Sequence, residues 1–484
     1  MADHLLVIDE GTTSTRAMLF TPDGRCIASE SAELTQSYPC PGWVEHDAAE
    51  IWRKTLRVTA AMVAQAGGAQ RIVGIGITNQ RETVVFWDKH TGEPLAPAIV
   101  WQDRRTADRC QTLRNAGHEP LVQRRTGLLL DPYFSGSKIG WALAEWPQLA
   151  EAGDRLAIGT VDSWLLWKLT GRHATDATNA SRTALMALDG GWDDELIDLF
   201  GAPRAALPEI VDCAGPIGDT TRFGGCIPIT GMAGDQQAAA IGQACLAPGE
   251  TKATFGTGAF ILTHTGDAAP ISTNRLLATV AWQLGGARAY ALEGSVFVAG
   301  SLVKWLRDSL GLIADARETA ALAASVPDSG GVYLVPALSG LGAPWWRPDA
   351  RAALTGMSFS TVKAHVVRAA LEAMAHQAHD LKDAFAADGA AWAMLRIDGG
   401  MVANDWLAQD LADILALPVE RPRFAETTAL GAAMLAGVGA GLFRDLHEAS
   451  AMRGEVERFE AKLDDGARKQ RLSGWRSAVQ KVIA

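Results

Sequence analysis

Apolar and polar segments alternate along the first 80 residues in a way that predicts strands ending in polar turns. Apolar runs at 5–8 and 17–20 flank the polar turn 9–13 and predict a β-hairpin. A third strand is expected near 26–29. The β-branched and glycine-rich run 71–77 predicts a further buried strand, directly followed by polar residues. Strands around a helix in this order predict a mixed α/β layer with its loops gathered at one edge.

Two stretches have the spacing of amphipathic helices. The first begins after the N-cap candidate Asp47, and the second covers 362–385, whose histidines we expect to be solvated. By contrast, 174–183 predicts a polar loop with no catalytic group. On the first helix, the residues expected to face the core are Ile51, Leu56, Ala60 and Val63.

A strand at 227–230 leads through Gly231 and Gly234 to Asp235 and an alanine-rich helix. Asp235 is therefore expected at the N-cap or in the first turn, where the helix dipole stabilises an ionised carboxylate. Such a carboxylate, held in a cleft, can accept a proton from an alcohol. A plain N-cap aspartate is the alternative.

The second half of the chain echoes the first. Residues 253–267 again give strand, Gly-Thr tip and strand, and 246–249 resembles a linker. We therefore expect two α/β domains, 1–246 and 247–484, whose hairpin tips close on a triphosphate from both sides. A Gly-Gly pair at 399–400 follows another strand and lets a flat ring lie against the backbone.

Composition narrows the function classes. The 484 residues are 20% charged with a net charge of −11, and no basic stripe is visible, which argues against a nucleic-acid partner. The six cysteines form no C-x-x-C pair, so reduced thiols are expected. No apolar run approaches the roughly 18 residues of a membrane span, and the N-terminal residues do not resemble a signal peptide. These features predict a cytoplasmic protein without a membrane span.

The first hairpin tip carries candidate chemistry for phosphate and magnesium. Gly11 allows close approach of the backbone, the neighbouring N–H groups and hydroxyls can donate to oxygens, and Asp9 can hold a cation. An ordinary hairpin with a polar turn is the alternative. Arg81 and Glu82 could bind the hydroxyls of a small polyol, or form a local ion pair on a solvated loop. Trp101 could cover the carbon side of that polyol or belong to the core.

Several stretches together resemble the FGGY carbohydrate kinase family. This resemblance implies two actin-like ATPase (ribonuclease H-like) domains that face a central cleft and close over ATP and a polyol. The stretches, which run in order through most of the chain, are DEGTTSTR (9–16), GITNQRET (76–83), WQDRR (101–105), DPYFSGSK (131–138), GMAGDQQAA (231–239), FGTGAF (255–260), SGLGAPWW (339–346), the signature-like segment 352–372 and DGGMVAN (398–404).

By position, the resemblance implies ATP-dependent phosphorylation of glycerol to sn-glycerol 3-phosphate, with ATP and Mg²⁺ as cofactors and a homodimer or homotetramer as the assembly. Asp235 would be the general base and Asp9 would serve the magnesium ion. The glycerol site would comprise Arg81, Glu82, Trp101, Tyr133, Asp235, Gln236 and Phe260. The nucleotide and its phosphates would be bound by Thr12, Thr13, Ser14, Arg16, Thr257, Gly300, Lys304, Gly400 and Asn404.

Three positions depart from the family pattern. Glu10 stands where relatives usually have Gln, and Lys304 stands where a Gln often contacts the nucleotide. The segment 221–228 is shorter than the glycine-rich loop through which a sugar bisphosphate inhibits some relatives, which predicts weak or absent inhibition by fructose 1,6-bisphosphate. Two alternatives stay open: an FGGY kinase for another small polyol or sugar, and an actin- or Hsp70-like nucleotide-driven binding protein.

Overall fold

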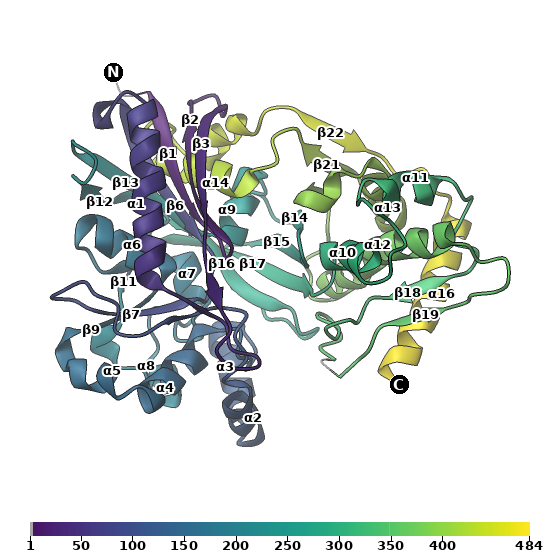
Figure 1. Cartoon of the computed structure of the whole chain (residues 1–484), viewed down its shortest axis with the longest axis horizontal. Coiled ribbons are helices and arrows are strands. Elements are labelled where there is room, and N and C mark those ends of the chain that lie inside the picture. The colour runs from purple at the N-terminus through teal and green to yellow at the C-terminus, as the bar shows by residue number, and fades with distance from the viewer. Residues whose placement is uncertain (1–2, 348) are drawn as a thin grey trace.

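Two sheets, one from each half of the chain, form the framework of the molecule (Figure 1). The computed structural model describes residues 3–347 and 349–484. The first sheet has the strand order β12-β13-β6-β1-β2-β3. Its strands are β1 (His4–Glu10), β2 (Ser14–Phe20), β3 (Cys26–Glu33), β6 (Ile72–Asn79), β12 (Ala214–Thr220) and β13 (Ile227–Gly234).

The second sheet has the order β16-β17-β15-β14-β20-β21-β22 and repeats the pairing of the first. In the first sheet, β1 pairs with β2 antiparallel and with β6 parallel; in the second, β14 pairs in the same two ways with β15 and β20. The two predicted hairpins are therefore confirmed. The strands are β14 (Glu250–Phe255), β15 (Ala259–Gly266), β16 (Leu277–Leu284), β17 (Ala287–Val296), β20 (Met394–Asp398), β21 (Val419–Pro422) and β22 (Val456–Phe459).

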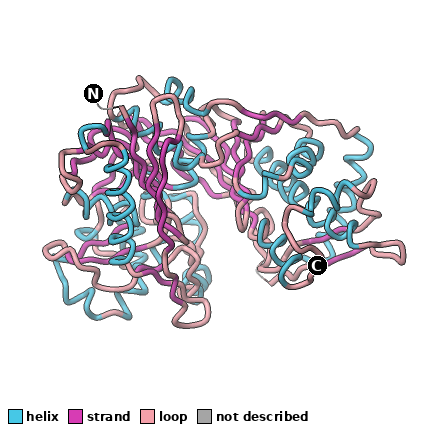
Figure 2. The backbone as a smooth tube through the Cα atoms, turned by 45° about the horizontal axis from the view of Figure 1, so that its top comes forward, coloured by secondary structure: helices cyan, strands magenta, loops and turns pink. Residues whose placement is uncertain are grey.

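Smaller sheets and the helices surround this framework, as the tube in Figure 2 shows. The remaining strands are β4 (Gln36–Ser37), β5 (Glu45–His46), β7 (Val84–Asp88), β8 (Ala98–Ile99), β9 (Leu156–Thr160), β10 (Ala174–Asp176), β11 (Glu209–Val211), β18 (Tyr333–Val335) and β19 (Ala353–Thr355). The α-helices are α1 (Ala48–Gln65), α2 (Ala107–Asn115), α3 (Glu119–Thr126), α4 (Ser135–Glu145), α5 (Pro147–Ala152), α6 (Val161–Thr170), α7 (Ala177–Ser181), α8 (Asp194–Phe200), α9 (Asp235–Gly242), α10 (Gly300–Asp308), α11 (Glu318–Ala324), α12 (Lys363–Ala387), α13 (Asp405–Leu415), α14 (Thr427–Gly439), α15 (Leu446–Ala449) and α16 (Asp465–Ile483). Short 3₁₀ turns lie at Ala69–Arg71, Gly153–Arg155, Arg204–Ala206, Gly400–Ala403 and Ser450–Arg453.

Side chains of β1 serve two cores because successive residues of a strand point to opposite faces. Leu6 and Ile8 pack in a cluster with residues of α1, whereas Leu5 and Val7 pack in a cluster with residues of α14. Helix α14 comes from the second half of the chain but covers strands of the first sheet (Figure 1). The second half of the chain thus contributes a helix to the core of the first sheet.

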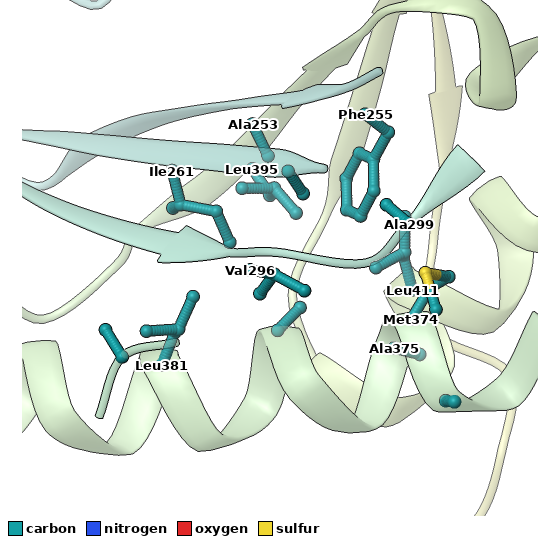
Figure 3. Packing of buried hydrophobic residues seen from close by; sticks show 14 of the residues in the cluster. Ala253, Phe255, Ile261, Val296, Ala299, Met374, Ala375, Leu381, Leu395 and Leu411 are labelled. Atoms are coloured by element: carbon teal, nitrogen blue, oxygen red, sulfur yellow. The ribbon is translucent and has the colours of Figure 1, made fainter. Parts of the chain in front are cut away.

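The second sheet packs on the long helix α12. Val296 from the sheet lies over Met374 and Leu381 of this helix in one continuous cluster (Figure 3). The predicted core helix at 362–385 is confirmed, but the expectation that its histidines are solvated is wrong for His376. That ring is buried and stacks on Trp475 of α16, with ring centroids 5.2 Å apart.

The buried face of α1 and the segment 174–183 also differ from the prediction. Asp47 caps α1 as predicted, but Ala60 is exposed and Leu56 only half-buried. Thr55 is fully buried instead, and its hydroxyl donates to Glu10. The predicted loop 174–183 folds as β10 and the short helix α7, and this segment is buried throughout.

Candidate functional site

The carboxyl ends of β6 and β13 bring the first candidate residues together. These strands are parallel neighbours with Asn79 opposite Gly234, so the segments that follow them meet at one edge of the sheet. Arg81 follows β6 and Asp235 follows β13 as the first residue of α9. The Arg81 Nε atom lies 3.2 Å from Asp235 Oδ1. The predicted association of these two residues is therefore present in the structure.

Asp235 is only partly exposed. Its side chain is 32% exposed, and Oδ1 also accepts a hydrogen bond of 2.7 Å from the backbone N–H of Gln236. Burial raises the pKa of Asp235 above its ordinary value, while Arg81 and Lys252 act to lower it. Burial therefore outweighs the stabilisation that its helical position predicted. A raised pKa makes the carboxylate a stronger proton acceptor than a solvated one.

Arg81 and Glu82 belong to a buried ion network of two arginines and two glutamates. Arg81 Nη1 lies 2.7 Å from Glu293 Oε2, and the Arg182 Nη2 atom lies 2.9 Å from Glu293 Oε1. Arg182 Nε lies 2.6 Å from Glu82 Oε1, which places each arginine between the two carboxylates. Burial alone would raise the pKa of Glu293, but the two guanidinium groups lower it to about 2. Burial raises the pKa of Glu82 despite these arginines.

The network is built from three separate segments of the chain. Glu293 comes from β17 of the second sheet and Arg182 from the end of α7. The sequence indicated neither residue, because nothing in the local pattern at 174–183 or 290–296 distinguishes a buried ion pair from a solvated charge. Glu82 adopts a φ of +60°, and the side chains of Ser135 and Lys138 donate to its backbone oxygen at 3.1 and 3.4 Å. These bonds hold a conformation that residues other than glycine rarely adopt.

Three aromatic rings lie together beside the network. Trp101 packs edge-on against Tyr133 and Phe260, with centroid distances of 5.7 and 6.3 Å. The Tyr133 hydroxyl accepts a hydrogen bond of 3.4 Å from Arg81 Nη2, and burial raises the pKa of this phenol. The indole N–H of Trp101 donates to Thr12 Oγ1 at 2.9 Å. The candidate polyol residues are thus in direct contact with the first hairpin tip.

At the first hairpin, formed by β1 and β2, Asp9 and Arg16 form an ion pair. Asp9 Oδ2 lies 2.5 Å from Arg16 Nη2, and Arg16 Nη1 lies 2.6 Å from Glu426 at the start of α14. The backbone N–H of Gly11 donates to the oxygen of Ser14 at 3.0 Å, and the oxygen of Thr13 accepts from Leu34 at 2.8 Å. Burial raises the pKa of Asp9 more strongly than Arg16 lowers it.

Glu10, next in the chain, is fully buried. The Thr55 hydroxyl donates to its Oε2 at 2.7 Å, whereas Oε1 is buried without a hydrogen-bond partner among the described residues. Burial raises the pKa of Glu10 to about 8. At neutral pH the side chain is therefore a neutral acid, close in shape and charge to the glutamine expected from the family pattern.

Five of the nine candidates for binding the nucleotide and its phosphates line one cavity of about 710 Å³ in the second half of the chain, whereas the four at the first hairpin tip do not line it. It lies between the β14–β15 hairpin tip, α10, α11 and the turn after β20. Thr257, Gly300, Lys304, Gly400 and Asn404 all face it. A side chain at Gly300 would place its Cβ 2.6 Å from the backbone oxygen of Gly256, so only glycine fits this close approach. Asn404 caps α13 by accepting from the Leu407 N–H at 3.2 Å, and its amide nitrogen donates to Thr319 at the same distance.

Comparison with known proteins explains this arrangement. The models of the N-terminal and C-terminal domains of the FGGY family of carbohydrate kinases match residues 4–242 and 251–440. The chain belongs to the FGGY family of carbohydrate kinases. It is 54% identical to the glycerol kinases of Methylobacterium nodulans and Alcanivorax borkumensis, over 99% of this chain and 98% of each relative. A crystal structure of Plasmodium falciparum glycerol kinase with ADP matches with a TM-score of 0.95 at 36% identity, covering 100% of this chain and 99% of that one.

FGGY membership confirms the predicted fold, a pair of actin-like ATPase domains. As kinases, members of this family use a nucleotide, in agreement with the cavity beside Thr257. Within residues 3–347 and 349–484, no helix has the length and hydropathy to cross a membrane. The same residues contain no cluster of three or more His, Cys, Asp or Glu side chains that could hold a metal. A magnesium ion bound with ATP needs only one or two carboxylates, and the first hairpin tip presents one, Asp9, which is paired with Arg16.

Proposed function

We propose that this FGGY kinase transfers the γ-phosphoryl group of ATP to glycerol and forms sn-glycerol 3-phosphate. The observation that carries the proposal is the contact between Asp235 and Arg81 beside the aromatic rings of Trp101, Tyr133 and Phe260. The carboxylate and guanidinium groups can pair with the hydroxyls of glycerol, and the aromatic rings can pack on its carbon atoms. The full-length similarity to glycerol kinases supports the same substrate.

In this proposal Asp235 acts as the general base. Its carboxylate takes the proton of a terminal glycerol hydroxyl while that oxygen bonds to the γ-phosphorus, and the bond from phosphorus to the leaving ADP oxygen breaks. Such a base contributes about 10²–10⁴-fold to the rate. Most of the remaining catalysis comes from positioning and from stabilisation of charge on the phosphoryl oxygens.

The other candidate residues would bind magnesium, glycerol, the phosphates or the rest of the nucleotide. Mg²⁺ would supply charge neutralisation on the phosphates, and Asp9 would hold it. The glycerol site would comprise Arg81, Glu82, Trp101, Tyr133, Gln236 and Phe260, with Thr12, Thr13, Ser14, Arg16 and Thr257 toward the phosphates and Gly300, Lys304, Gly400 and Asn404 toward the nucleotide. Since Arg16 already pairs with Asp9 and Glu426, binding of the phosphates by Arg16 requires it to share or exchange these partners.

A kinase for another small polyol or sugar is the second candidate. The three aromatic rings leave less room for a five-carbon sugar, which favours glycerol. An actin- or Hsp70-like nucleotide-driven binding protein is a weaker candidate, because the buried groups around Arg81 would then have no substrate to recognise. We also propose the domain division 1–246 and 247–484, a homodimer or homotetramer, and a cytoplasmic location.

The experiment is release of ADP from ATP with and without glycerol, for the wild type, Asp235→Asn and Asp219→Asn. Asp219 is an exposed aspartate of β12 and serves as the matched control. We expect turnover to depend on glycerol, to fall about 10²–10⁴-fold in Asp235→Asn and to stay unchanged in Asp219→Asn. Glycerol-independent turnover would favour the binding-protein alternative, and a largely active Asp235→Asn would remove Asp235 as the base.

A further inference from the structure

One buried lysine beside the site has no part in the mechanism above. Lys252 lies on β14 of the second sheet, five residues before the tip residue Thr257, and its side chain is fully buried. A buried ammonium group must be paired and hydrogen-bonded. Its Nζ atom donates to Gln236 Oε1 and, at 2.8 Å, to Thr254 Oγ1. Burial lowers the pKa of Lys252, and the carboxylates of Asp398, Asp235 and Glu293, from three other elements, act against this by stabilising its charged form.

The contact between Lys252 and Gln236 decides which way the Gln236 amide faces. An ammonium group has only donors, so the carbonyl oxygen of Gln236 must point to it. The NH₂ group of Gln236 is then directed away from Lys252. Gln236 is half-buried and is the neighbour of Asp235, whose Oδ1 its backbone N–H already contacts.

We propose that Lys252 is a positioning residue that sets substrate specificity by fixing Gln236 as a hydrogen-bond donor. Asp235 would accept the proton of one glycerol hydroxyl, and the NH₂ group of Gln236 would donate to the oxygen of a second. Without Lys252 the amide can rotate and present its oxygen instead. This inference rests on the proposed function, because it requires glycerol in the site.

The geometry also ties substrate recognition to the second sheet. Lys252 of β14 contacts Gln236, and Glu293 of β17 contacts Arg81. Two residues of the proposed glycerol site are therefore held by charges from the sheet that carries the Thr257 tip.

The test compares kcat/KM for glycerol, 1,2-propanediol and 1,3-propanediol, each diol lacking one hydroxyl. Gln236→Met has a side chain of similar length without an N–H. We expect it to reduce discrimination against one diol by about 10-fold, the effect of one lost hydrogen bond. Lys252→Met should reduce the same discrimination, and the double variant should lose no more than Gln236→Met alone. Thr254→Val removes the other partner of Nζ and should preserve discrimination.

Additive losses in the double variant, or an equal loss on all three substrates in Lys252→Met, would overturn the proposal. If Lys252→Met does not fold, Gln236→Glu tests the proposal instead. The glutamate side chain keeps an acceptor for Lys252 but has no side-chain N–H to donate to glycerol. It must lose as much discrimination as Gln236→Met, and retained discrimination contradicts the proposal. Glycerol-dependent ADP release by the wild type tests the proposed function separately from these comparisons.

Discussion

Substitution of the buried acid Glu10 by glutamine should stabilise the protein at neutral and alkaline pH. The folded environment raises the pKa of Glu10 from an ordinary 4.5 to about 8. Between these two values the folded protein holds a proton that the unfolded chain releases, so the wild type loses stability as pH rises from 4.5 to 8. Below pH 4.5 the acid is protonated in both states and the effect is absent.

The size of this stability difference follows from how far the pH lies above the pKa of Glu10 in the unfolded chain. Neutral pH lies about 2.5 units above 4.5, and each unit corresponds to about 1.4 kcal/mol, which gives about 3 kcal/mol at pH 7. Glutamine has no proton to lose and keeps an oxygen for the Thr55 hydroxyl. Glu10→Gln should therefore match the wild type near pH 4.5 and exceed it by about 3 kcal/mol at pH 7.

The assay is urea unfolding of both proteins at several pH values between 4.5 and 8.5. Glu33→Gln provides the control, because Glu33 is an exposed residue of β3 and its substitution should leave the pH dependence unchanged. A constant difference between Glu10→Gln and the wild type across this range would refute the reasoning. So would a loss of stability in the variant at pH 8.

Three further outcomes follow from the site. Glu293→Gln leaves Arg81 and Arg182 with an uncompensated buried charge, so urea unfolding should show a loss of about 3–5 kcal/mol; an unchanged midpoint would contradict this account of the network. Trp101→Leu should lower kcat/KM for glycerol about 10-fold, because carbon contacts and the bond to Thr12 are lost, with a wild-type value as the contrary result. Millimolar fructose 1,6-bisphosphate should leave the initial rate unchanged, and clear inhibition would overturn the prediction drawn from the short segment 221–228.

The strand and turn framework could be predicted because its signals are local. The apolar run 5–8, its polar tip and the later Gly-Thr tip each lie within a few residues, and both hairpins formed as expected. Asp235 was placed at the start of a helix because a strand, two glycines and an alanine-rich run surround it. Motif resemblance supplied what these patterns did not, the roles of residues far apart in sequence.

What the sequence did not indicate depends on partners distant along the chain. Arg182 and Glu293 are 111 residues apart, and their charges become a buried network only when α7 and β17 meet. Thr55 lies on the buried face of α1 because it is about one turn from Ile51, whereas Ala60 is about two and a half turns from Ile51 and points to the opposite face. His376 is buried because Trp475 stacks on it, and Trp475 comes from α16, about 100 residues further along the chain.

The most direct test of the central claim is the stoichiometry of products in a reaction of the wild type with ATP, Mg²⁺ and glycerol. ADP and sn-glycerol 3-phosphate would be quantified in the same samples, with Asp235→Asn run in parallel. We predict equal amounts of the two products in the wild type and a loss of both in the variant. ADP without sn-glycerol 3-phosphate, or undiminished formation of both by Asp235→Asn, would contradict the account.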